Sequence, residues 1–212
     1  MKNNQQATKF AVLIATFISV QIVMTVIPFL GFIPIFAINI TTLHLPTLLA
    51  GMLLGVKGGA IIGLTFGMMS VMNATIRPGL VSFVFSPFAP APAGFNGNPL
   101  SLLVAIVPRI LLGVFAALIY QFAKKKRWQR FASTSAAVIA TVLHTWMVLS
   151  LIFMIFAHPY AVALDLDGPR GVLAFLGLIV VQNSIFEAIL AGVLMTVFVT
   201  ALEPIVKKMV NQ

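Results

Sequence analysis

The chain has 212 residues, of which 60% are hydrophobic and only 8% are charged. A water-soluble domain carries about 25% charged residues, so a chain this apolar cannot cover itself with polar surface and must be dissolved by a lipid bilayer. The absence of cysteine excludes disulfides and thiolate metal sites, and the net charge of +9 does not form the aromatic-interleaved basic stripe typical of nucleic-acid binding.

Apolar stretches bounded by Pro, Gly, Asn or charged residues predict six transmembrane helices, because a spanning helix needs roughly 20 apolar residues. We expect an all-α integral membrane bundle, with residues 1–212 forming a single domain. The first stretch lacks a signal-peptide cleavage site and is interpreted as a retained helix. The predicted helices span residues 9–28, 44–56, 58–74, 99–123, 133–157 and 169–203.

The second predicted helix is short for a full crossing, and the segment before it is unusual. Residues 29–42 are apolar but interrupted by Gly31 and Pro34. This pattern predicts a re-entrant or partly extended segment. Such backbone is tolerated at membrane depth only where it is buried in protein or lines a cavity.

Basic residues are distributed unevenly between the two ends of the predicted bundle. If the N-terminus is cytoplasmic, ten of the 13 basic residues fall at the cytoplasmic end, Arg77 and Arg170 fall outside, and Arg109 lies within a helix. The positive-inside rule therefore predicts that both termini are cytoplasmic. The ten residues are Lys2, Lys9, Lys57, Lys124, Lys125, Lys126, Arg127, Arg130, Lys207 and Lys208.

The long loop between the third and fourth predicted helices, residues 75–98, is then external. It is rich in Pro, Gly, Ser and Phe and carries one charge, so it is less polar than a solvated linker. We expect it to fold back over the bundle as a lid, since long structured loops are often functional.

Two ionisable residues fall inside predicted helices. Arg109 lies about ten residues from the outer end of its helix, where an arginine is costly unless it faces the interior and finds a partner. Glu187 follows Asn183 by one turn, so the two share a helix face. Glu187 could be the counter-ion of Arg109, or Arg109 could be available to a ligand, and the sequence leaves both readings open.

Further polar residues fall in the outer or middle part of the predicted bundle. His144 could bind a ligand or hydrogen-bond a neighbouring helix. Arg77 could bind a carboxylate or anchor to lipid headgroups. Together these residues predict a pocket that is open outward and sealed inward. The candidate substrate-binding set is Asn73, Arg77, Arg109, His144 and Asn183.

No catalytic or metal-binding motif is present. The sequence lacks a phosphate-binding loop, a zinc-protease motif and a nucleophile elbow. The three histidines, His44, His144 and His158, have no metal-ligand spacing. We therefore expect a solute-binding or transport protein without catalytic residues, metal or cofactor.

Small residues repeat every four positions in two places. Ala7, Ala11 and Ala15 form a smooth stripe on the first helix, which would suit either packing within the bundle or the approach of another protein. A glycine series indicates close packing between the second and third predicted helices. It comprises Gly51, Gly55, Gly59, Gly63 and Gly67.

The stretch HLPTLLAGMLLGVKGGAIIGLTFGMMS, residues 44–70, the alanine stripe and the six-helix layout together resemble the substrate-binding S components of energy-coupling factor (ECF) vitamin importers. The resemblance implies a bacterial plasma-membrane protein that binds a vitamin at its outer face. It also implies docking, through Ala7, Ala11 and Ala15, on an energising module. That module comprises one transmembrane scaffold subunit and two ATPase subunits, which use the ATP.

Within that family, residues 73–88 look most like pantothenate-specific members. Pantothenate carries one carboxylate, one amide and two hydroxyls. The resemblance thus implies Arg77 or Arg109 for the carboxylate, with Asn73, Asn183 and His144 for the other groups. The alternatives are an S component for a different vitamin and a stand-alone secondary transporter or channel for a small solute. The stand-alone transporter would usually need more helices or an internal repeat.

Overall fold

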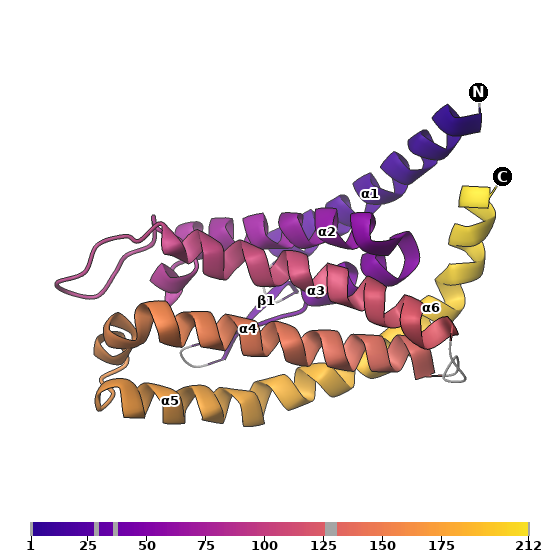
Figure 1. The fold of residues 1–212 in the computed structure, drawn as a ribbon. Helices are drawn as coiled ribbons and strands as arrows, with labels where there is room; N and C mark the ends of the chain where they lie inside the picture. Colours follow the sequence, from indigo (N-terminus) through magenta and orange to yellow (C-terminus); the bar gives the residue numbers. More distant parts are fainter. Residues whose placement is uncertain (1, 28–29, 36–37, 126–130, 212) are drawn as a thin grey trace.

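The protein was analysed as a computed structural model that describes residues 2–27, 30–35, 38–125 and 131–211. Within these ranges, six α-helices and one antiparallel hairpin make up the fold (Figure 1). The helices are α1 (Lys2–Val26), α2 (His44–Ile76), α3 (Leu100–Lys125), α4 (Ala132–Ala163), α5 (Gly168–Ile179) and α6 (Ile185–Asn211). The strands are β1 (Phe32–Ile35) and β2 (Ile38–Thr41), with a 3₁₀ turn η1 (Ser82–Val84) and a π-helical turn η3 (Val180–Ser184).

The all-helical prediction is confirmed, with fewer helices of membrane-spanning length than the six predicted. In the described part of the chain, five helices are long and apolar enough to span a membrane: α1, α2, α3, α4 and α6. The sixth predicted helix corresponds to α5, η3 and α6 in succession. The second and third predicted helices both fall within α2.

α2 reverses direction at Gly55, whose φ of 75° and ψ of −169° are not helical. A Cβ placed on Gly59 would lie 2.9 Å from the Cα of Gly51, whereas eight residues of straight helix span about 12 Å. The two parts of α2 therefore lie side by side. The sequence predicted this turn at Lys57 and Gly58, and it occurs earlier because Gly55 accepts the positive φ. The first part, about 16 Å long, reaches only about halfway across a bilayer.

Glycines bring α2 and α3 into backbone contact. A Cβ on Gly113 of α3 would lie 2.1 Å from the carbonyl oxygen of Gly59, and a Cβ on Gly63 would lie 2.2 Å from that of Arg109. Without side chains in the way, the two helices approach more closely than larger residues permit. The predicted glycine series therefore does serve helix packing, with α3 as an additional partner.

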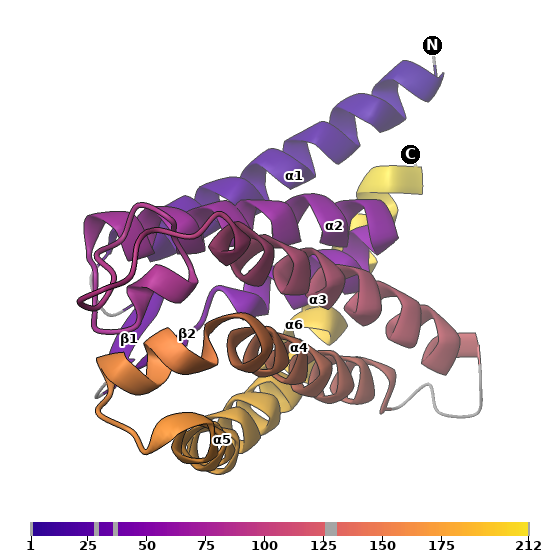
Figure 2. The ribbon, with the colours of Figure 1, turned by 60° about the vertical axis from the view of Figure 1, so that its left-hand side comes forward.

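The partly extended segment before α2 is the β1–β2 hairpin. Phe32 pairs with Thr41 and Ile35 pairs with Ile38. In both ribbon views the hairpin lies between α2 and α5 (Figures 1 and 2). The paired strands satisfy one another's backbone groups, as backbone inside a bundle requires.

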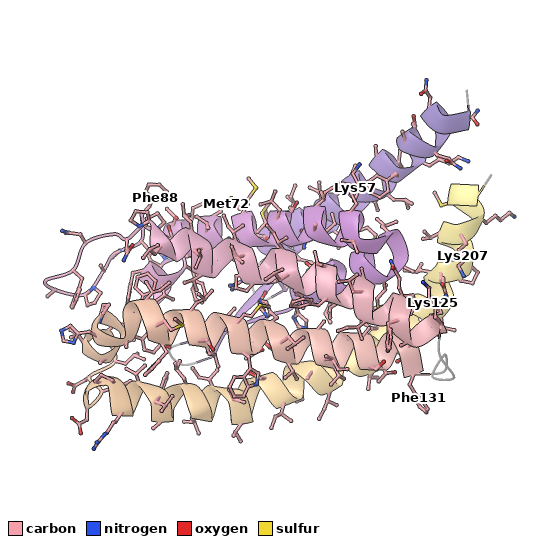
Figure 3. The ribbon with its side chains drawn as sticks, viewed as in Figure 1. Lys57, Met72, Phe88, Lys125, Phe131 and Lys207 are labelled. Carbon is pink, nitrogen blue, oxygen red and sulfur yellow. The ribbon has the colours of Figure 1, made fainter. Side chains whose placement is uncertain are left out.

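Both termini lie at one end of the bundle, and the loop between α2 and α3 lies at the other (Figure 1). Lys57, Lys125 and Lys207 are all at the end that carries the termini (Figure 3). This clustering agrees with the expected topology, although which side of the membrane it faces stays a prediction. The first turns of α1 project away from the other helices in both ribbon views.

Candidate substrate-binding site

A cavity of about 100 Å³ lies among β2, the loop after α2, and helices α3 to α6. The loop supplies an apolar wall of Val81, Val84 and Phe85. Val84 in this part of the loop is fully buried, whereas the predicted role of the whole loop as an external lid stays a prediction. The polar lining consists of Thr41, Arg109, His144, Thr145, Tyr160, Ser184 and Glu187.

The position of the Arg109 side chain follows from the proline before it. Pro108 lies inside α3 and has no N–H, so the carbonyl of Val104, four residues earlier, receives no helical hydrogen bond from it. The Nη1 of Arg109 donates to that carbonyl at 2.7 Å. The proline therefore frees an acceptor that holds the guanidinium against its own helix.

Two aromatic rings complete the surroundings of Arg109. Its guanidinium carbon lies 5.5 Å from the ring centre of Phe66 on α2 and 5.1 Å from that of Phe85 in the loop. The residue is only 5% exposed, and its Nε has no hydrogen-bond partner in the structure. Arg109 lines the cavity, and its guanidinium would gain from an anionic partner because an unpaired buried donor is costly.

His144 on α4 is the second predicted residue that the structure brings to the cavity. Its ring packs 6.2 Å from that of Phe66, so Phe66 supports both His144 and Arg109. The Nε2 of His144 is buried and has no partner. An imidazole donates from one nitrogen and accepts at the other, which suits an amide or a hydroxyl.

Glu187 on α6 also lines the cavity, close to the backbone of Thr41. Among the side chains that the structure describes, Glu187 forms no ion pair with Arg109, whose closest polar contact is Val104. The two side chains interact electrostatically within one cavity but form no direct ion pair. Glu187 is therefore a nearby counter-charge of Arg109, and the guanidinium is not occupied by a bond to it.

The other three predicted residues are not brought to the cavity lining. Arg77 is exposed, and its Nη2 donates to the Val26 carbonyl at the end of α1, 3.4 Å away. Asn73 is buried in α2 but is not one of the lining residues. Asn183 lies in η3, and its side chain falls outside the part of the chain that is described.

Several lining residues were not predicted from the sequence. Thr41 ends a strand, and Ser184 ends a π-helical turn, a feature often found at functional sites. Thr145 follows His144 directly, and Tyr160 lies four turns further along α4. Of these, only Ser184, in the polar run at residues 182–184, left a signal in the sequence.

The profile of the "ECF transporter, substrate-specific component" family matches residues 9–199. The chain belongs to this family. It is therefore the substrate-binding S component of an ECF transporter, a multi-pass membrane protein and not an enzyme. S components associate with an energising module.

Two bacterial proteins are similar to this S component along most of their length. The "Pantothenic acid transporter PanT" of Lactococcus lactis subsp. cremoris is 34% identical over 192 residues, covering 91% of this chain and 88% of the relative. The "Pantothenate transporter PanT" of Leuconostoc mesenteroides subsp. mesenteroides is 28% identical over 218 residues, covering 98% of each.

Proposed function

We propose that this S component captures pantothenate for an ATP-driven ECF importer, with the chain acting as one binding domain. The names of both relatives support this ligand. The observation that carries the proposal is the buried Arg109 with a free Nε at a cavity of mixed apolar and polar lining. Such a site suits a ligand that has one carboxylate, a few hydrogen-bonding groups and apolar carbon between them.

Arg109 is the proposed partner of the pantothenate carboxylate. Of the two arginines considered from the sequence, Arg109 lines the cavity, whereas Arg77 is exposed and bonded to the end of α1. Inside the membrane, a charge-assisted hydrogen bond to a carboxylate offsets the desolvation of both groups. His144, with its free Nε2, is the proposed partner of the amide.

α1 is the proposed docking surface for the energising module of one transmembrane scaffold subunit and two ATPase subunits. Ala7, Ala11 and Ala15 are all exposed, so none of them is used to pack this bundle. A free stripe of small residues lets another helix approach closely. In this arrangement the end that carries both termini faces the cytoplasm, and the partner subunits use the ATP.

The ligand is tested by native mass spectrometry of the purified S component. We expect a bound mass equal to that of pantothenate, and a different vitamin would overturn the assignment. Uptake is tested in vesicles with this chain alone and with the energising module added. Uptake that needs the module and ATP supports the proposal, whereas ion-driven uptake by the chain alone would refute it.

The carboxylate partner is tested by measuring pantothenate affinity after single substitutions. Arg109→Ala should weaken binding by at least about tenfold, since a desolvated charged hydrogen bond contributes about 1.5–3 kcal/mol. Arg77→Ala is the matched control and should change affinity by less than about twofold, because Arg77 lies away from the cavity lining. The reverse order of effects would contradict the proposal.

A further inference from the structure

Glu187 is the one carboxylate among the residues that line the cavity, and the proposed function leaves it without a role. It lies in the first turn of α6, one turn after Ser184, which also lines the cavity and ends the π-helical turn. Thr41 of β2 faces the same space. The cavity therefore has an acceptor-rich region on α6 and β2, distinct from the arginine on α3.

A carboxylate in a membrane-embedded cavity must receive hydrogen bonds or pair with a cation, since an unpaired buried charge is strongly unfavourable. The natural cation would be Arg109, but the two form no ion pair in the described structure. Arg109 is held instead by Val104, Phe66 and Phe85. A backbone hydrogen bond with Thr41 and the nearby charge of Arg109 stabilise Glu187, and its carboxyl group retains lone pairs that can accept hydrogen bonds from a bound molecule.

The charges of Arg109 and Glu187 would favour one orientation of a ligand in the cavity. A ligand carboxylate is attracted to Arg109 and repelled by Glu187, so it has one favourable orientation. Glu187 and Ser184 line the same cavity, so other groups of a ligand whose carboxylate meets Arg109 can reach them. The carbonyl oxygen of a carboxyl group accepts hydrogen bonds in either protonation state, so donor groups on the ligand would match Glu187.

We propose that Glu187 is a specificity residue that accepts hydrogen bonds from hydroxyl groups at the end of the ligand opposite its carboxylate. This inference rests on the proposed function, because pantothenate has its carboxylate and its two hydroxyls at opposite ends. Glu187 then sets both the orientation of the ligand and the preference for a hydroxylated one. A site built to bond a hydroxyl discriminates strongly against an analogue that lacks it, since the buried acceptor is left unpaired.

The test compares two probes on the full chain in detergent: pantothenate, and an analogue in which hydrogen replaces both hydroxyls. The unmodified protein should bind pantothenate at least about tenfold more tightly than the analogue. Glu187→Gln should weaken pantothenate binding and reduce this ratio to about threefold or less, because an amide is a weaker acceptor. If Glu187 only stabilised the fold, Glu187→Gln would weaken the binding of both probes and leave the ratio of their affinities unchanged. A smaller ratio therefore indicates that Glu187 contacts the hydroxyl groups.

Glu203→Gln is the matched control. Glu203 is also a carboxylate of α6, but it pairs with Lys124 and Lys207 at the end of the bundle that carries the termini. This variant should keep the ratio of the unmodified protein. If Glu187→Gln does not fold, Glu187→Asp retains the charge on a shorter side chain and should give an intermediate ratio.

The outcomes separate this inference from the proposed function. An unchanged ratio in Glu187→Gln, with pantothenate still bound by the unmodified protein, would overturn the role of Glu187 and leave the proposed function standing. Failure of the unmodified protein to bind pantothenate would overturn both.

Discussion

Replacing Pro108 by alanine should weaken ligand binding without making the protein less stable. Pro108→Ala restores an N–H that can donate to the Val104 carbonyl, the acceptor that now holds Arg109 at 2.7 Å. Proline inside a helix costs about 3 kcal/mol relative to alanine, but the lost arginine hydrogen bond offsets about 1.5–3 kcal/mol of that gain, so the free energy of unfolding should change little or rise slightly. Losing a charged hydrogen bond removes about 1.5–3 kcal/mol of the energy that orients the guanidinium. Because 1.4 kcal/mol is tenfold in affinity, binding should weaken by about tenfold to 150-fold.

The assay combines thermal unfolding in detergent with pantothenate titration, both on the same preparation. Pro204→Ala is the matched control, since Pro204 lies inside α6 and is exposed, away from the cavity lining. It should share any stabilisation but bind normally. Pro108→Ala binding as tightly as the unmodified protein would refute the link between the proline and the arginine, and so would equal weakening in both variants.

Two further predictions concern packing and docking. Gly113→Ala places a Cβ 2.1 Å from the Gly59 carbonyl oxygen, so thermal unfolding should show a loss of about 1–3 kcal/mol, while Gly177→Ala, with no atom within 4 Å, should be neutral or stabilising. Ala11→Phe should leave pantothenate binding intact but abolish co-purification with the energising module. Val20→Phe, on the opposite face of α1, should retain it, and equal behaviour of the two variants would contradict the docking proposal.

The helices could be predicted from the sequence because their signal is local. Length and hydropathy located α3 to within two residues, but the predicted segments stop six to eight residues short of the start of α1 and of the ends of α4 and α6. The apolar break at Gly31 and Pro34 indicated extended backbone where β1 and β2 occur. The turn within α2 was placed at Lys57 rather than at Gly55, since the charge suggested a solvated end. A positive φ leaves no trace in composition.

The binding residues were harder to predict because they depend on which helix faces meet. Arg109 and His144 were found from depth in the membrane, and that criterion also selected Arg77 and Asn73, which lie away from the cavity lining. Glu187 was considered only as a counter-ion. Its position in the cavity follows from the π-helical turn and from a hairpin far away in the sequence, and neither could be located without coordinates.

The rings of Phe66 and Phe85 also affect the protein while its binding cavity holds no ligand. An arginine in a vacated membrane pocket would ordinarily have to recruit an anion or water to offset its isolation. Here two ring faces remain beside it whether or not a guest is present, and each attracts a cation. The rings thus offset part of the cost of the buried charge, and a bound carboxylate would supply the hydrogen-bond acceptor that the Nε of Arg109 lacks.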